Sequence, residues 1–222
     1  MSEKGPKGDF FGGLENAKKC GPAASALRKA ADILREVGMP EEARKLYKIS
    51  VQFYEKAGEY ETAAYAYGYA AYILKEAGWP EKALELVEPL KSVAQMAEDV
   101  GEYGPAAYAY EKAAGILREA GKHEEAIELY EISAQLRERA GEYRDAAWAY
   151  WSVVDILKEA GWPEKALELV EPLKSLAQRV EDAGEYEYAA RVYWYAADIL
   201  RAAGKTSEAN ELERKASMLL GD

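Results

Sequence analysis

Apolar residues recur along this chain at steps of three and four, in blocks of about 20 residues. In one block they include Ala63, Ala64, Tyr67, Ala70 and Leu74. Because an α-helix completes a turn every 3.6 residues, this spacing places the whole set on one face. Each block therefore predicts one amphipathic helix.

A glycine closes each block, and these glycines are evenly spaced. They lie at positions 38, 58, 78, 101, 121, 141, 161, 184 and 204, at intervals of 20 or 23 residues. Glycine is the usual residue at the left-handed C-cap of a helix. Pro40, Pro80 and Pro163 follow two residues later, where the first turn of a helix accepts proline. Such short connections predict antiparallel neighbouring helices.

The blocks combine into a larger repeat of 83 residues. Residues 58–99 match residues 141–182 at 31 of 42 positions, and the segment at 73–92 recurs unchanged at 156–175. The larger repeats run at about 18–100 and 101–183, with a half copy at 184–222. A single hairpin cannot bury its apolar stripe, so the sequence predicts an all-α, right-handed α-solenoid of five hairpins and ten helices.

Two parts of the chain interrupt this pattern. Residues 1–13 lie outside the period and contain five Gly and Pro residues, so we expect a flexible tail followed by one repeat domain at 14–222. Pro89 and Pro172 fall inside the two 23-residue blocks. A proline inside a helix removes a backbone hydrogen bond and crowds the preceding turn, so we expect a kink or break in each block.

The segments GEYETAAYAYGYAAYIL and GKHEEAIELYEISAQL resemble tetratricopeptide repeats (TPRs). The shared features are a turn glycine followed by characteristic aromatic, polar and alanine positions, here Gly58, Tyr60, Ala63 and Tyr67, and Gly121, His123, Ala126 and Tyr130. The resemblance covers Gly21 to the C-terminus. Hairpins of 40 and 43 residues exceed the usual 34 and look like the long-helix repeats of the soluble NSF attachment protein (SNAP) family. The resemblance implies peptide or protein binding in a concave groove lined by the first helix of each hairpin.

We expect the first helices to begin near residues 22, 61, 104, 143 and 186, because paired alanines there allow close packing. The stripe opposite their core face is unusually aromatic, which is typical of binding anchors. The candidate partner-binding residues on it are Tyr65, Tyr69, Tyr72, Lys75, Tyr108, Arg118, Trp148, Trp151, Trp194 and Tyr195. Alternatively, these rings fill the inside of a tight superhelix or pack between hairpins.

The last member of the stripe is basic in every copy: Arg35, Lys75, Arg118, Lys158 and Arg201. This column could clamp an acidic peptide. Alternatively, each cation only stabilises the negative end of its helix dipole, by ~0.3–1 kcal/mol.

The composition narrows the classes of function. A net charge of −11 disfavours nucleic acid and anionic membrane as partners. No stretch approaches the ~18 apolar residues of a transmembrane helix, and the lone Cys20 cannot form an internal disulfide. We therefore expect a cytoplasmic protein, with a composition like that of thermophile proteins.

The residues offer little catalytic chemistry. His123, the only histidine, is expected in an exposed turn, and one Cys with one His falls short of a zinc site. We expect no enzyme activity, cofactor or metal. The sequence predicts a scaffold or adaptor that binds a peptide or protein segment in an aromatic concave groove. A structural homo-oligomer, or an engineered repeat scaffold without small-molecule chemistry, is the alternative.

Overall fold

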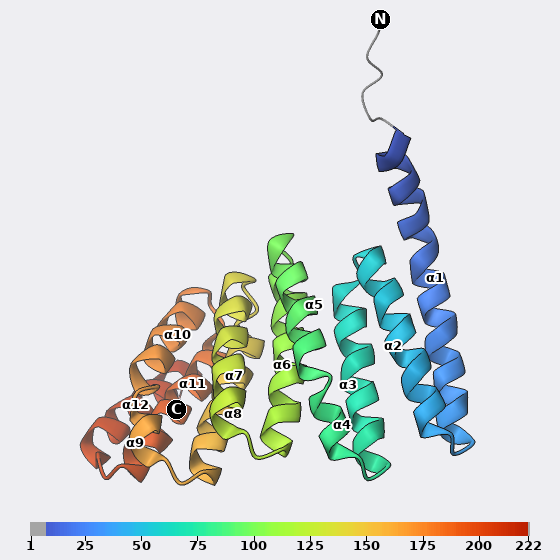
Figure 1. The fold of residues 1–222 in the computed structure, drawn as a ribbon. Helices are drawn as coiled ribbons and strands as arrows, with labels where there is room; N and C mark the ends of the chain where they lie inside the picture. Colours follow the sequence, from blue (N-terminus) through green and yellow to red (C-terminus); the bar gives the residue numbers. More distant parts are fainter. Residues whose placement is uncertain (1–7, 222) are drawn as a thin grey trace, which may run out of the picture. The chain divides into compact units, whose positions relative to one another are not determined.

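The computed structural model describes the backbone of residues 8–221 and the side chains from residue 19 onward, and all regular elements within this range are helices (Figure 1). They are α1 (Gly8–Glu36), α2 (Pro40–Ala57), α3 (Tyr60–Glu76), α4 (Pro80–Leu84), α5 (Val87–Asp99), α6 (Tyr103–Glu119), α7 (His123–Arg139), α8 (Tyr143–Glu159), α9 (Pro163–Leu167), α10 (Val170–Asp182), α11 (Tyr186–Ala202) and α12 (Thr206–Leu220). The all-α prediction is confirmed. The chain divides into two compact units, Met1–Ile116 and Leu117–Asp222.

The two 23-residue blocks each form two helical segments, so the ten predicted helices become twelve segments across residues 8–221. The break between α4 and α5 lies at Glu85 and Leu86, four and three residues before Pro89. A proline ring crowds the carbonyl four residues earlier, which is where the helix stops. Pro89 then sits in the first turn of α5, where an N–H has no partner within the helix, so its absence costs no hydrogen bond of α5. Pro172 has the same place in α10, so both predicted breaks are confirmed.

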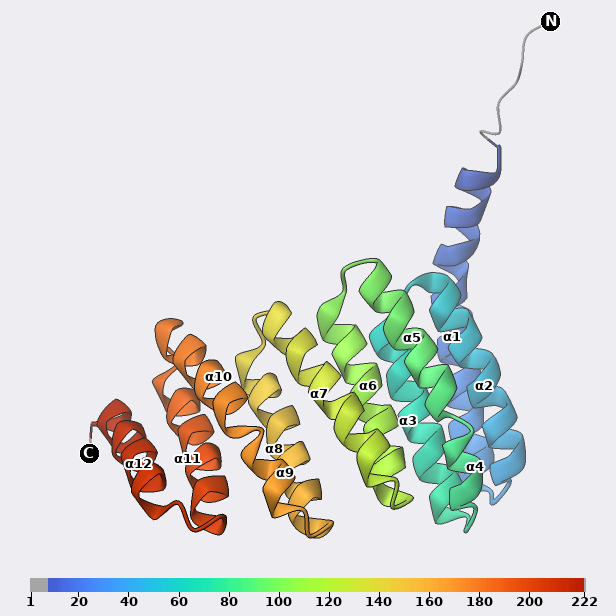
Figure 2. The same cartoon turned by 60° about the vertical axis from the view of Figure 1, so that its left-hand side comes forward.

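Helix α1 begins well before the repeat pattern does. It starts at Gly8 and contains Pro22, so the expected helix start near residue 22 is wrong, and residues 8–13 of the expected tail are helical. The division into a tail at 1–13 and a repeat domain at 14–222 stays a prediction. The segment 14–20 is rich in good helix formers, and the helix continues through Pro22 at the loss of one backbone hydrogen bond. Figure 2 shows α1 extending beyond the end of α2. The other part of the predicted tail, residues 1–7, lies outside the described residues.

The glycine caps are confirmed. All nine predicted cap glycines have positive φ angles, between 71° and 82°. After α3, the Gly78 N–H donates to the Lys75 carbonyl (2.9 Å) and the Trp79 N–H donates to the Leu74 carbonyl (2.8 Å). This pair of bonds is the Schellman arrangement that ends a helix. The next helix begins directly afterwards with Pro80 at its first turn.

A tyrosine in the second helix of a hairpin packs against the first helix of the next one. In the first unit, Tyr47 of α2 is fully buried and meets Tyr69 of α3 edge-on, with ring centroids 5.7 Å apart. In the second unit, Tyr130 of α7 lies 83 residues later and meets Trp148 of α8 in the same way, at 5.9 Å. Such edge-to-face pairs contribute beyond their buried area. They fix the stripe aromatics relative to the hairpin before them.

Candidate functional site

The predicted stripe lies at the surface of the first helices. In α3, Tyr65 and Tyr72 are 48% and 53% exposed, whereas Tyr67 on the core face is 6% exposed. In the second unit, Trp148 and Trp151 on α8 and Trp194 on α11 are likewise exposed. Tyr69, Tyr108 and Tyr195 are half-buried. Large aromatic side chains on a surface are unusual enough to mark a candidate interaction site.

Three of the tyrosines form a stacked column along α3. The rings of Tyr65 and Tyr69 are 6.2 Å apart and nearly parallel, at 9°. The rings of Tyr69 and Tyr72 are 6.3 Å apart, at 16°. Tyr69 also packs on Tyr47, so the alternative that stripe rings pack between hairpins holds for this residue, as it does for Trp148 on Tyr130. The two outer rings of the column remain accessible.

Arg35, from the last turn of α1, reaches this column from the neighbouring hairpin. Its guanidinium carbon lies 5.3 Å from the centroid of the Tyr69 ring, and its Nη1 donates a hydrogen bond to the Tyr69 hydroxyl. Arg35 and Tyr72 also line a cleft of about 410 Å³ between the ends of α1 and α3. Its other lining residues are Gly38, Pro40, Ile73, Glu76 and Ala77. A cation, an aromatic ring and an open cleft thus occur together in the first unit.

Lys112 of α6 approaches the stripe from the other side. Its ammonium lies 4.5 Å from the centroid of the Tyr108 ring. Its stem crosses Gly68 of α3, where a Cβ atom would stand only 3.0 Å from the Lys112 Cδ. The absence of a side chain at Gly68 therefore leaves space for the Lys112 side chain to cross α3. This contact was not predicted from the sequence, although the two residues occupy neighbouring stripe positions in successive copies.

The stripe of the first unit carries an excess of positive charge, and we call its cations and tyrosines the basic stripe. Its members are Arg28, Lys29, Arg35, Tyr65, Tyr69, Tyr72, Lys75, Tyr108 and Lys112. Five cations stand against two carboxylates at the stripe positions, in a chain of net charge −11. Of these carboxylates, Asp32 accepts a hydrogen bond from Tyr47 and lies 3.8 Å from Arg28, and Glu111 is buried.

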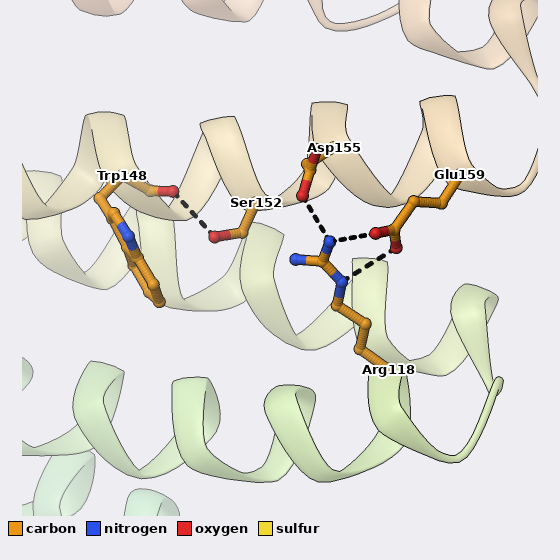
Figure 3. A network of polar contacts seen from close by, with 5 residues as sticks. All are labelled: Arg118, Trp148, Ser152, Asp155 and Glu159. Atoms are coloured by element: carbon orange, nitrogen blue, oxygen red, sulfur yellow. Dashed lines mark hydrogen bonds and ion pairs between the residues drawn. The ribbon is translucent and has the colours of Figure 1, made fainter.

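Arg118 has a different environment from the one expected beside Tyr108. Figure 3 shows its guanidinium bound to two carboxylates of α8. Nε donates to Glu159 Oε2 (3.1 Å), Nη2 donates to Glu159 Oε1 (2.7 Å), and Nη2 also donates to Asp155. The bonds to Glu159 raise the pKa of Arg118 above its ordinary value. This bidentate pair joins α6 to α8, a role that neither the clamp nor the dipole interpretation considered.

Two hairpin loops each contain a tryptophan that was not predicted to belong to a site. Lys82 lies 4.1 Å from the ring centroid of Trp79, and Lys165 lies 4.3 Å from that of Trp162. The signal was present in the repeated segment WPEK at 79–82 and 162–165. Trp162 also lines a cleft of about 280 Å³ in the second unit, which is the counterpart of the cleft beside Arg35. Its other lining residues are Leu157, Lys158, Gly161, Pro163, Ala166, Ile199 and Ala202.

His123 is half-buried at the start of α7, not exposed as expected. Its ring meets Trp162 edge-on at 6.2 Å, and its Nδ1 is buried with no hydrogen-bond partner. Within the described residues, no group of three or more His, Cys, Asp and Glu side chains is placed to hold a metal ion. No helix in the same part of the chain is long and apolar enough to cross a membrane.

Comparisons with known proteins agree with this architecture. Tetratricopeptide repeat models match residues 12–114 and residues 105–172. Putative kinesin light chain TPR-like repeats from Podosopora anserina are similar in structure, with a TM-score of 0.55 at 18% identity, over 88% of this chain and 94% of that one. BtubC (BKLC) from P. vanneervenii is similar with a TM-score of 0.53 at 16% identity, over 94% of this chain and 87% of that one. A search of curated proteins finds no match.

The fold and these matches define the class of protein. The chain is a tetratricopeptide-like helical repeat protein, with tetratricopeptide repeats matched across residues 12–172. Repeats of this class generally mediate protein–protein interactions, which points to an interaction scaffold. The narrower resemblance to SNAP-type repeats stays a prediction.

Proposed function

We propose that the basic stripe of the first unit binds an extended, acidic segment of a partner protein. The observation that carries this proposal is the contrast between the stripe and the chain around it. Five cations and four tyrosines share the stripe with two carboxylates, in a protein whose net charge is −11. Such a surface attracts an acidic segment, whereas the negatively charged remainder of the chain repels it.

The tyrosine column suits a binding surface because it is ordered before any partner arrives. Tyr65 and Tyr72 each stack on Tyr69, which is held by Tyr47 and Arg35. Binding therefore costs little side-chain entropy at these rings. Their faces offer apolar contact, and the exposed side chains of Lys29 and Lys75 add positive charge that attracts carboxylates.

The stripe of the second unit has a different chemistry. Trp148, Trp151 and Trp194 are exposed there. Several neighbouring cations are paired within the chain: Arg191 Nη2 with Glu187 Oε1 (2.6 Å), Arg201 with Glu213, and Arg118 with Glu159. We infer that this surface, with Tyr195, contributes apolar anchors to a partner and little attraction for acidic groups.

A random-peptide display selection tests the proposal. Wild type is compared with Tyr72→Ala/Lys75→Glu, which removes one ring and one cation from the basic stripe. The matched control is Tyr186→Ala/Lys48→Glu, which makes the same chemical changes at exposed residues outside it. Tyr186 is as exposed as Tyr72, at 53%. All three proteins are first shown to be folded by circular dichroism.

We expect wild type and the control to enrich one shared motif rich in Asp or Glu, and the stripe variant to lose it. Affinity for the enriched peptide should fall as salt rises, because exposed charges are screened. Enrichment of no motif by wild type, or equal enrichment by the stripe variant, would refute the peptide-binding stripe. A cytoplasmic location and the lack of enzyme activity, cofactor, nucleic-acid or membrane partners stay predictions.

A further inference from the structure

One isoleucine recurs at the same position of every first helix, and only its first copy is exposed within the described residues. The five copies are Ile33, Ile73, Ile116, Ile156 and Ile199. The last four are between 0% and 8% exposed, whereas Ile33 is 60% exposed. Val37 and Met39, which follow Ile33 at the end of α1, are 64% and 42% exposed. This end of the first unit therefore has an apolar face that no described residue covers.

The chain itself shows what kind of surface covers this isoleucine elsewhere. Ile73 lines a cleft with Gly38 and Pro40, at the tip of the hairpin before it. Ile199 lines the counterpart cleft with Trp162 and Pro163, again at the tip of the preceding hairpin. The exposed face of α1 is thus the continuation of an interface that the chain uses internally.

The exposed face of α1 has the spacing of a helix-packing seam. Ala26, Ala30, Ile33 and Val37 are separated by four, three and four residues, and the Val37 N–H still donates to the Ile33 carbonyl (3.1 Å). Such a seam packs against another helix. If two copies of α1 run antiparallel about a two-fold axis between Ala30 and Ile33, each Ile33 lies opposite Ala30 of the second copy. Each Val37 then lies opposite Ala26, so large and small residues interdigitate.

On α12, at the opposite end of the chain, Met218 and Leu220 are exposed apolar residues, but three positions that are apolar or aromatic in α7 are polar. At the positions where α7 carries Ile127, Tyr130 and Ile132, α12 carries Asn210, Glu213 and Lys215. Glu213 is paired with Arg201 of its own hairpin. A head-to-tail contact would have to bury this pair and its neighbours, which carries a desolvation cost. The apolar face of α1 is therefore better matched to itself than to α12.

We propose that the seam of α1 forms the interface of a two-fold symmetric dimer of this chain. The contact uses the same residues on both copies, so assembly closes at two. Arg28 and Arg35 of the basic stripe lie on a different face of α1 from the seam, whereas Lys29 borders the seam, four residues before Ile33. The dimer therefore does not depend on the peptide-binding function proposed above, and it would present two basic stripes to one partner.

Sedimentation velocity of the full chain tests the proposal over a concentration series from about 1 to 200 μM, which brackets a micromolar dissociation constant. Wild type is compared with Ile33→Glu/Val37→Glu. The control is Met218→Glu/Leu220→Glu, which places the same charges on exposed apolar residues of α12. Both variants alter exposed side chains, so circular dichroism should show unchanged folding. The variant Tyr72→Ala/Lys75→Glu reports on the basic stripe.

We expect wild type, the α12 control and the stripe variant to approach twice the monomer mass and go no further. Ile33→Glu/Val37→Glu should remain a monomer throughout. Three outcomes would overturn the proposal: a wild type that is monomeric at every concentration, a mass that keeps growing as head-to-tail assembly requires, or a dimer that persists in the α1 variant. A wild type that forms the dimer but enriches no peptide would count against the proposed function alone.

Discussion

Arg35 of α1 lies over the ring of Tyr69 in α3 and donates a hydrogen bond to its hydroxyl, so one guanidinium joins two successive hairpins by a cation–π contact and a hydrogen bond. A cation–π contact at a partly exposed site is worth about 0.5–1 kcal/mol, and the hydrogen bond adds to it. A double-mutant cycle of Arg35→Ala and Tyr69→Ala, measured by urea denaturation, should therefore give a coupling energy of about 1 kcal/mol.

The same cycle with Arg35→Ala and Tyr186→Ala serves as the control. Tyr186 lies in the other unit, on α11, so the two changes should add within about 0.5 kcal/mol. If the effects of Arg35→Ala and Tyr69→Ala on the free energy of unfolding were also additive, the contact between these residues would not stabilise the packing of the two hairpins.

Arg118 and Lys158 have equivalent places at the ends of α6 and α8 but different surroundings. Arg118 is held by Glu159 and Asp155, whereas Lys158 is exposed. Arg118→Ala should lower the free energy of unfolding by about 1 kcal/mol, because it breaks a bidentate pair and leaves two carboxylates close together. Lys158→Ala should change it by less than about 0.5 kcal/mol. Chemical denaturation measures both changes. Equal losses of stability in the two variants would mean that the pairing of Arg118 with Glu159 does not stabilise the fold.

Arg118→Ala should also leave peptide affinity unchanged, since its guanidinium is already bound within the chain. Titration of the enriched peptide into this variant, with Tyr72→Ala/Lys75→Glu as the weakened reference, measures this directly. A loss of affinity as large as that of the reference would mean that Arg118 takes part in peptide binding, as expected from the sequence.

The sequence predicted the helices well because the relevant physics is local. The spacing of apolar residues, the cap glycines such as Gly78 and the breaks near Pro89 and Pro172 depend on residues within one or two turns. The start of α1 was missed because Gly21 and Pro22 look like a helix boundary. A helix can continue through such a pair when its flanking residues are strong helix formers.

The exposed aromatic stripe was also predictable, since a helical face follows from sequence spacing alone. The partners of its cations were not. Arg118 meets Asp155 and Glu159 across 37 and 41 residues, and Arg35 meets Tyr69 across 34. These contacts depend on how one hairpin is offset against the next, and the periodicity of the sequence does not determine that offset. The same applies to the contact between Lys112 and Gly68, which needs the side-chain geometry of both helices.

Two Gly→Ala substitutions should have opposite effects on stability. Gly58 caps α2 with a φ of 73°, a left-handed conformation that costs Ala about 1 kcal/mol. Gly68 lies inside α3, where Ala is favoured over Gly by about 1 kcal/mol. The new Cβ would meet only the flexible stem of Lys112, which can move aside. Thermal denaturation should therefore show a lower midpoint for Gly58→Ala and a higher one for Gly68→Ala.

A lowered midpoint for Gly68→Ala would mean that Lys112 is fixed where it lies. In that case Lys112→Ala in the same background should restore the stability, because it removes the atoms that the new methyl group meets. If the two losses simply added, the contact between Gly68 and Lys112 would not explain the effect.

Glu131 of α7 should make the protein's stability depend on pH in the acidic range. It lines a cleft together with Glu128 and Glu168. Burial raises the pKa of its carboxyl, and the nearby charges of Glu168 and Glu128 raise that pKa further. The folded state therefore holds this proton more tightly than the unfolded state. The stabilisation that comes from the protonated Glu131 carboxyl is therefore fully present below the pKa of this group in the unfolded state. It is lost as pH rises through the higher pKa of the same group in the folded state.

Glu131→Gln removes the ionising group while keeping its size, so it should raise the midpoint of urea denaturation at pH 7. The gain should shrink toward about pH 4, where the wild-type carboxyl is largely protonated in the fold. Glu211→Gln, at an exposed position of α12, makes the same change of charge and should show no such trend. A gain for Glu131→Gln that is equal at both pH values would instead come from packing, because only an ionisation loses its effect when the proton is bound.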